Sequence, residues 1–239
     1  MRSTRSRMRL VRPTPVSSIA ALATLAVIIG TAAFLVSSYP TLPDLLPVRF
    51  NLRGRPIGWQ YKTSLRVLVP SLVQAALAMT LGAVGTLLLS RTHKSGDDKT
   101  PDMVAAATAV EAIALVCFVW VAFQAYAAGA LVQMWQTGRG GLGQLYSWLT
   151  AAGIVLTIAV AFRAHRSLGR PEPRQFVAEH WRFGQLYNNP SDPALFVPTR
   201  DGSRWTLNFG RPVAAALLAV ALLVGVVAPT IILAVLLRM

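Results

Sequence analysis

The sequence is poor in charge, and acidic residues are scarcest of all. Charged residues make up 13% of the 239-residue chain, and only nine residues are Asp or Glu. Soluble domains usually carry about a quarter of their residues as charges. Hydrophobic residues make up 54% of the chain. This balance excludes an ordinary water-soluble globule.

Cysteine and histidine are also rare, which bears on metal and redox chemistry. Cys117 is the single cysteine, so no intramolecular disulfide can form, and we interpret it as a small apolar filler. The three histidines, His93, His165 and His180, have unrelated spacings and no carboxylate cluster beside them. No Gly-x-Ser-x-Gly or His-Glu-x-x-His motif occurs. We therefore predict no metal site, no cofactor and no enzymatic activity.

Five stretches are long and apolar enough to cross a bilayer, whose core of about 30 Å requires roughly 20 apolar residues in a helix. They are Val16–Ser38, Val67–Leu89, Met103–Ala128, Leu145–Phe162 and Val213–Leu237. Four of them contain no charged residue, and the third contains only Glu111. The sequence thus predicts an all-α integral membrane protein with five transmembrane helices, whose first partner is the lipid bilayer.

The basic residues are unevenly distributed between the loops, and such residues are enriched on the cytoplasmic side of membrane proteins. An N-terminus inside places sixteen Lys and Arg in the cytoplasm and seven outside. We therefore predict a multi-pass protein of a bacterial inner membrane, N-in and C-out. This orientation accounts for the net charge of +14 without nucleic acid as a partner. A cleaved signal peptide is an alternative for the first span, although its apolar run exceeds the usual length of about 7–15 residues.

The spans divide the chain into segments with different expected environments. We predict a basic cytoplasmic tail (1–15), a two-helix domain (16–89) with an ordered outer loop (39–64), helices three and four (103–162), a cytoplasmic aromatic module (163–212) and a last helix (213–239). The outer loop contains Pro40, Pro43, Pro47 and Pro56, which prevent a continuous helix. Its candidate binding residues are Asp44, Arg49, Asn51, Arg53, Arg55 and Trp59.

The outer loop resembles the N-terminal membrane domain of SdpI-like immunity and signalling proteins. The family pattern, L-P-D-x-(I/L)-P-x-H-F-N-x-x-G-x-x-x-x-W, follows a first transmembrane helix. The matching residues are Leu42, Pro43, Asp44, Pro47, Phe50, Asn51, Gly54 and Trp59. The resemblance implies immunity or signalling. Arg49 stands where the family usually has His, so a titrating or metal-ligating imidazole is missing and a permanent positive charge replaces it.

The segment before the last span is rich in aromatic residues and turn residues. Seven aromatics lie there: Phe176, Trp181, Phe183, Tyr187, Phe196, Trp205 and Phe209. Leu195–Thr199 and Arg204–Phe209 flank a turn and predict a β-hairpin. The module is interpreted either as a docking or sensing unit, or as a structural cap that packs amphipathic aromatics at the membrane interface.

This module also resembles a small family of unknown function. The family pattern is roughly W-x-x-G-x-x-Y-x-N-P-x-D-P-x-x-F-V-P-x-R, followed by G-x-x-W-T-x-N-F-G-R-P. The resemblance identifies a module and implies no established activity. The candidate functional residues within it are Trp181, Tyr187, Asn189, Asp192, Arg200, Trp205, Asn208 and Arg211.

Polar and small residues inside the spans give three further predictions. Glu111 is an intramembrane acid, a type that is costly and often functional, so it is either a proton or cation site or a structural carboxyl joining helices. Pro229 removes a backbone hydrogen bond to Gly225 and should bend the last helix. Small residues at four-residue spacing predict close helix contacts in a compact bundle and leave a homodimer open: Ala78, Gly82 and Thr86, and Gly153, Thr157 and Ala161.

Two functions are consistent with these features. The leading hypothesis is a non-enzymatic sensor, immunity or regulatory membrane protein. In it the outer loop meets an external peptide or lipid, and residues 175–211 meet a cytoplasmic partner. The alternative is a small transporter or channel subunit in which Glu111 is the coupling site.

Overall fold

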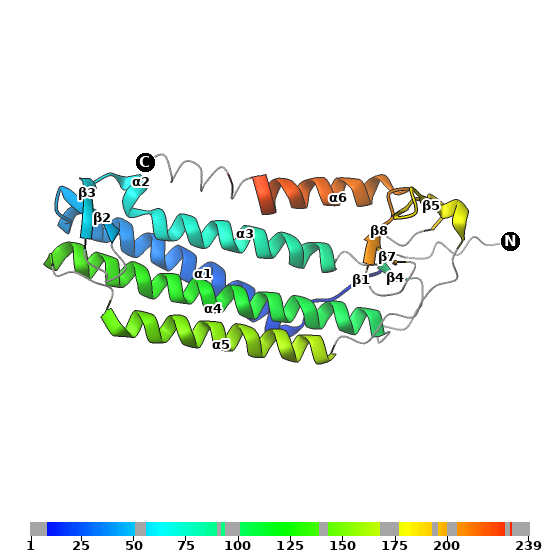
Figure 1. The fold of residues 1–239 in the computed structure, drawn as a ribbon, viewed down its shortest axis with the longest axis horizontal. Coiled ribbons are helices and arrows are strands. Elements are labelled where there is room, and N and C mark those ends of the chain that lie inside the picture. The colour runs from blue at the N-terminus through cyan, green and yellow to red at the C-terminus, as the bar shows by residue number, and fades with distance from the viewer. Residues whose placement is uncertain are drawn as a thin grey trace.

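Four long helices lie side by side and form the body of the molecule (Figure 1). The computed structural model describes residues 9–50, 56–89, 92–93, 101–138, 143–167, 177–192, 196–199, 205–227 and 230. The long helices are α1 (Pro15–Ser38), α3 (Val69–Leu89), α4 (Pro101–Thr137) and α5 (Gly143–Ser167). Each is long and apolar enough to cross a membrane, as predicted for the first four spans.

The predicted fifth span begins as an apolar helix. α6 (Pro212–Leu222) continues into a π-helical turn, Leu223–Val227, and packs along α3. Within the described residues this helix is shorter than the four long ones. Residues 228–229 and 231–239 lie outside the described part of the chain, so the fifth membrane crossing stays a prediction.

The outer loop folds into a β-hairpin, which corrects the all-α expectation. A 3₁₀ turn, Tyr39–Thr41, leads to β2 (Leu45–Phe50), β3 (Pro56–Tyr61) and the short helix α2 (Ser64–Val67). β2 and β3 are antiparallel. Prolines are accommodated because each strand of a two-stranded sheet has a free edge, where the missing N–H breaks no ladder bond.

The hairpin is fixed to the ends of α1 and α4. The Trp135 indole Nε1 donates a hydrogen bond to the Pro47 carbonyl oxygen at 3.1 Å, and Gln136 Nε2 donates to Thr41 Oγ1 at 2.8 Å. An apolar cluster lies beneath the hairpin: Leu35, Leu42, Leu46, Val67, Ala128, Val132, Met134 and Trp135. The hairpin therefore contacts the ends of two helices directly.

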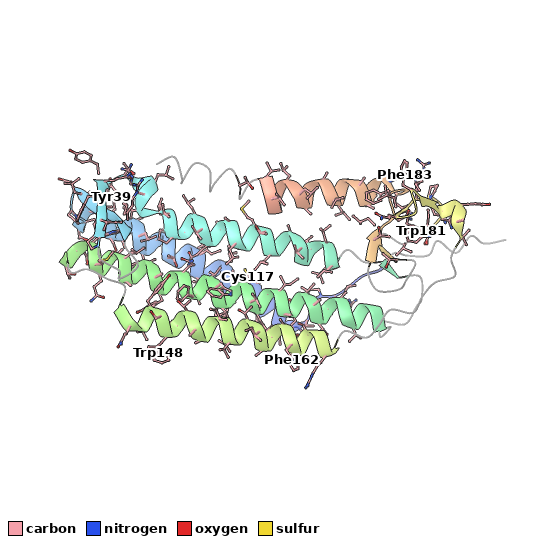
Figure 2. The ribbon with its side chains drawn as sticks, viewed as in Figure 1. Tyr39, Cys117, Trp148, Phe162, Trp181 and Phe183 are labelled. Carbon is pink, nitrogen blue, oxygen red and sulfur yellow. The ribbon has the colours of Figure 1, made fainter. Side chains whose placement is uncertain are left out.

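Hydrogen bonds join the helices within the bundle. Gln74, fully buried on α3, donates from Nε2 to the Val121 carbonyl at 2.9 Å and to Thr31 Oγ1 at 3.2 Å. Trp120 Nε1 donates to Thr157 Oγ1 at 3.0 Å. Such bonds matter because lipid supplies no hydrophobic drive for helices to associate. α5 carries an outward row of apolar side chains that includes Trp148 and Phe162 (Figure 2).

The aromatic module lies at the opposite end of the bundle from the β2–β3 hairpin (Figure 1). It contains a 3₁₀ turn (Ala178–His180) and four short strands: β5 (Trp181–Arg182), β6 (Leu186–Tyr187), β7 (Phe196–Pro198) and β8 (Trp205–Leu207). The β7–β8 pairing confirms the predicted hairpin. At the same end, β1 (Arg9–Leu10) pairs with β4 (Thr92–His93).

Candidate functional site

The β2–β3 hairpin presents an apolar surface to its surroundings. Alternate residues of a strand point to opposite faces. On one face Leu46 is completely buried against the bundle. On the other, Leu45, Ile57, Trp59 and Tyr61 are all at least 50% exposed, and these four residues are called the exposed hairpin face below. A surface of this kind suits a partner that offers apolar groups.

Charged side chains flank the exposed hairpin face at its base, where Asp44 and Lys62 lie, whereas Arg49 pairs with Gly58 and so lies on the opposite face of the hairpin. The Arg49 side chain is exposed, and its stem lies 3.2 Å from the point where a Cβ on Gly58 would stand, so only glycine fits there without displacing it. Asp44 is 93% exposed and lies 3.7 Å from the Lys62 ammonium. Lys62 also donates to the Leu42 carbonyl at 2.7 Å. Of the predicted residues, Trp59 is part of the exposed hairpin face, Asp44 lies at the base of the hairpin and Arg49 lies on the opposite face, while Asn51, Arg53 and Arg55 lie outside the described residues.

In the module, Asn208 joins two turns that are far apart in sequence. It is completely buried. Its Oδ1 accepts from the Asn189 N–H at 3.0 Å and the Gly210 N–H at 3.1 Å. Its Nδ2 donates to the carbonyls of Asn189 at 2.8 Å and Asp192 at 3.0 Å. All four hydrogen-bonding positions of this carboxamide are therefore occupied by backbone.

The predicted module residues around Asn208 also face inward. The buried Tyr187 hydroxyl donates to Asp192 Oδ2 at 3.1 Å, and Asn189 Nδ2 donates to the Tyr187 hydroxyl at 3.3 Å. Trp181 stacks edge-on against Tyr187 with ring centres 5.3 Å apart. These contacts support the structural interpretation of the motif. Arg211 precedes α6 and is half-buried; Arg200 and the Trp205 side chain lie outside the described residues.

Phe183 is an exposed residue that the sequence analysis did not single out. It is 93% exposed at the turn between β5 and β6 and points away from the module (Figure 2). Its φ of +52° is unusual for a bulky residue, and Gly184 follows with a φ of +72°. The signal in the sequence that could have identified Phe183 is an aromatic residue followed by glycine between two short strands. Phe183 is thus the module's most exposed apolar side chain among the described residues.

Glu111 has partners on two other helices, which the spans alone did not suggest. Its Oε2 accepts a hydrogen bond from the Thr14 hydroxyl at 2.8 Å, and its Oε1 lies 3.7 Å from the Arg163 guanidinium. Thr14 also caps α1, because its side chain accepts from the Ser17 N–H. Glu111 therefore lies level with the first turn of α1, near the module end of the bundle. It ties α1, α4 and α5 together there.

The described residues form exposed surfaces suited to binding, and they do not bring together a set of metal ligands. The described residues contain no group of three or more His, Cys, Asp and Glu placed to hold a metal ion. The hollow beside Glu111, lined also by Thr108, Leu115 and Arg163, measures about 30 Å³. This is far below the volume of typical small-molecule pockets.

Comparison with known proteins identifies one short segment. A model of a family of unknown function (DUF5808) matches residues 190–214, from the Pro190 turn into the start of α6. This agrees with the resemblance of the module to a small family of unknown function. No link to SdpI-like proteins is found for the hairpin, so that resemblance stays a prediction. No curated protein and no solved structure matches the chain.

Proposed function

We propose that this chain is a non-enzymatic sensor or regulatory protein of a bacterial inner membrane, oriented N-in and C-out. In this proposal the exposed hairpin face binds an external peptide or lipid, and the module meets a cytoplasmic partner. The observation that carries it is the exposed hairpin face itself, an apolar surface held on the ends of α1 and α4. The SdpI-like resemblance of this segment supports the same function, including an immunity role.

The helices provide a route between the two ends. α1 begins beside Glu111, which lies in the module half of α4, and both helices end beneath the hairpin. A ligand that shifts these helix ends by its contacts at the hairpin changes the geometry at Thr14 and Glu111. Such coupling requires that the ligand bind the two arrangements with different affinity.

Site-specific photocrosslinking in native membranes tests the proposal. A photoreactive amino acid at Ile57, 61% exposed on the hairpin, should yield a discrete adduct. The same group at Trp148, 71% exposed on α5, is the matched control and should react with bulk lipid. Trp59→Ala and Arg49→Ala should each reduce the Ile57 adduct, because Trp and Arg commonly dominate binding energy.

The identity of the adduct separates the two external ligands. A peptide adduct that competes with added peptide supports a peptide sensor, and a defined lipid species supports lipid sensing. If Ile57 gives the same bulk-lipid products as Trp148, the exposed hairpin face lies in the membrane without a specific ligand. That outcome contradicts the proposal.

The alternative, a small transporter or channel subunit coupled through Glu111, has less support. Thr14 and Arg163 already occupy both carboxylate oxygens, and the neighbouring hollow is about 30 Å³. In vesicles containing the full chain, this alternative expects an ion flux that Glu111→Gln abolishes. Flux that persists in Glu111→Gln, or its absence from both proteins, argues against it.

A further inference from the structure

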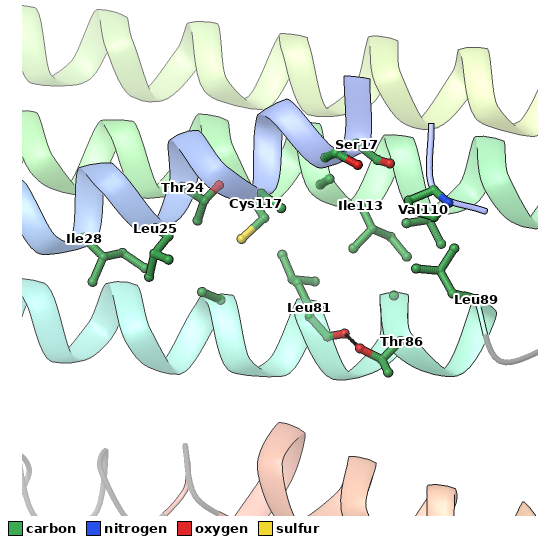
Figure 3. A pocket seen from close by; sticks show the side chains of 17 residues that line it. Ser17, Thr24, Leu25, Ile28, Leu81, Thr86, Leu89, Val110, Ile113 and Cys117 are labelled. Atoms are coloured by element: carbon green, nitrogen blue, oxygen red, sulfur yellow. Dashed lines mark hydrogen bonds between the residues drawn. The ribbon is translucent and has the colours of Figure 1, made fainter. Parts of the chain in front are cut away.

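A cavity of about 420 Å³ lies between α1, α3 and α4, within the size range of ligand sites (Figure 3). Ser17, Thr24 and Leu25 line it from α1, Gly82 from α3, and Val110 and Cys117 from α4. The cavity is called the α1–α3 slot below. Glu111 is absent from its lining and instead lines the separate hollow toward α5.

A row of small residues on α3 creates the slot. Ala78, Gly82 and Thr86 were expected to bring helices into close contact, but at Gly82 the structure has open space instead. A Cβ added at Gly82 would meet no atom within 4 Å. The same three residues also line a second hollow of about 240 Å³ against α6. These small residues thus line hollows on both sides of α3.

Three hydroxyl groups in the wall of the slot already donate to the backbone of their own segments. Ser17 Oγ donates to the Thr14 carbonyl, Thr24 Oγ1 to the Ala20 carbonyl and Thr86 Oγ1 to the Gly82 carbonyl, each at 2.8 Å. A polar ligand would lose its hydrogen bonds to water on entering the slot. It would gain none from these hydroxyl protons, which are already donated to carbonyls, so its binding would be costly. A hydrocarbon loses nothing there, so the wall favours an apolar occupant.

The slot has the length of one membrane leaflet. On α3 it extends from Ala78 to Leu89, which at 1.5 Å per residue is roughly 16 Å. The hydrocarbon core of a bilayer is about 30 Å thick, so this is about half of it. The slot runs along the helices, which is also the direction in which acyl chains lie in a membrane.

A positive charge stands at the module end of the slot. Pro13 lines the slot there, and the preceding residue, Arg12, is exposed. The Val11 N–H donates to the Leu89 carbonyl at 3.1 Å, which holds this part of the chain against the end of α3. Basic residues near a membrane surface attract anionic lipid headgroups. No acidic residue occurs among those lining the slot.

We propose that the α1–α3 slot binds one acyl chain of an anionic phospholipid from the leaflet on the module side, with its phosphate near Arg12. Hydrocarbon fills the apolar slot, and the guanidinium interacts with the headgroup. The site is independent of the function proposed for the hairpin. It explains why α3 presents small residues to open space.

Native mass spectrometry of the full chain, purified in mild detergent and titrated with phosphatidylglycerol or phosphatidylcholine, tests the site. The chain should retain one phosphatidylglycerol in preference to phosphatidylcholine. Gly82→Leu fills the slot and should weaken retention about tenfold, equivalent to about 1.4 kcal/mol. Gly30→Leu is the matched control, because a Cβ at Gly30 also meets nothing within 4 Å and Gly30 does not line the slot. Arg12→Gln should keep a bound lipid and lose the preference for phosphatidylglycerol.

A second measurement uses Cys117, the single cysteine of the chain, which lines the slot. A membrane-permeant thiol reagent should modify Cys117 faster in delipidated protein than after phosphatidylglycerol is added. This readout needs no substitution, so it holds even where Gly82→Leu fails to fold. Equal modification rates, or Gly82→Leu protein that retains lipid like the natural chain, would overturn the proposal. Gly82→Leu could instead convert a dimer to a monomer without changing lipid retention. That result would show that a second copy of the chain occupies the slot, and it would also overturn the proposal.

Discussion

The Thr80 hydroxyl lies 2.9 Å from the Gly225 carbonyl oxygen and 3.0 Å from the Ala76 carbonyl of its own helix, so the proton that these two acceptors share links α3 to the π-helical turn that follows α6. In a regular helix that carbonyl would accept from the residue four positions later, which is Pro229. Proline has no N–H to donate. Thr80 therefore offers this carbonyl a donor from another helix, at the place where Pro229 was predicted to remove a backbone bond.

We predict that Thr80→Val destabilises the protein by about 1 kcal/mol, because a membrane-embedded carbonyl loses its partner. The measurement is the free energy of unfolding of the full chain in mixed detergent micelles. Thr150→Val is the control, since the Thr150 hydroxyl bonds the Tyr146 carbonyl of its own helix. Equal effects of the two substitutions would argue against the interhelical bond.

Gly225 allows α6 to approach α3 closely. A Cβ on Gly225 would lie 2.8 Å from the Ala83 Cβ, a distance that two side chains do not tolerate. We expect Gly225→Ala to separate the two helices at a cost of roughly 1–3 kcal/mol, and Ala83→Gly in the same chain to restore part of the loss. Unfolding measurements on both variants check this. Gly129→Ala, which meets open space, should have a small effect, and failure of Ala83→Gly to compensate would contradict the contact.

At Glu111 two substitutions can separate the contribution of the charge to the free energy of unfolding from the contribution of the hydrogen bond. Glu111→Gln keeps an oxygen that accepts from Thr14 and loses the ion pair with Arg163, whose side chain is 77% exposed. An ion pair at 3.7 Å with so exposed a partner contributes a few tenths of a kcal/mol. Glu111→Leu also removes the acceptor, so it should cost about 1–2 kcal/mol more. Equal losses of unfolding free energy in the two variants would show that the charge dominates.

Much of the fold could be predicted from hydropathy and proline content. The rest depends on contacts between residues that are distant in the sequence. The long apolar runs predicted five membrane helices because a helix satisfies its own backbone in a bilayer, and four of the five are long helices in the structure. The partners of Glu111 could not be inferred in this way, since Thr14 lies 97 positions away, outside the apolar runs. The hairpin was missed because prolines argue against a strand unless that strand has a free edge.

The module shows a different limit of the sequence. Its pattern singled out Tyr187, Asn189, Asp192 and Asn208, and the structure brings all four together. The pattern could not distinguish binding residues from structural ones, because both uses favour polar side chains near turns. Burial decides between them: Asn208 is completely enclosed, whereas Phe183, which received no special weight, is 93% exposed.

The structural role of Asn208 leads to a sharp prediction for isosteric and truncating substitutions. Asn208→Asp keeps the shape and the accepting oxygen but loses both Nδ2 donors, so a carboxylate faces the carbonyls of Asn189 and Asp192. Asn208→Ala removes all four bonds. Each should destabilise the module by about 2–4 kcal/mol, because buried backbone groups are left without partners.

Amide hydrogen exchange of the full chain in detergent, followed by mass spectrometry of peptides from 177–192, measures this effect. Both Asn208 variants should speed exchange there, while peptides from α4 remain protected. Ser191→Ala is the control, because the exposed Ser191 participates through its backbone N–H, which donates to Asn189 Oδ1 at 3.0 Å. If Asn208→Asp exchanged like the natural chain, its Nδ2 donors would be dispensable. The module would then be held chiefly by the Oδ1 bonds and by packing of Trp181 on Tyr187.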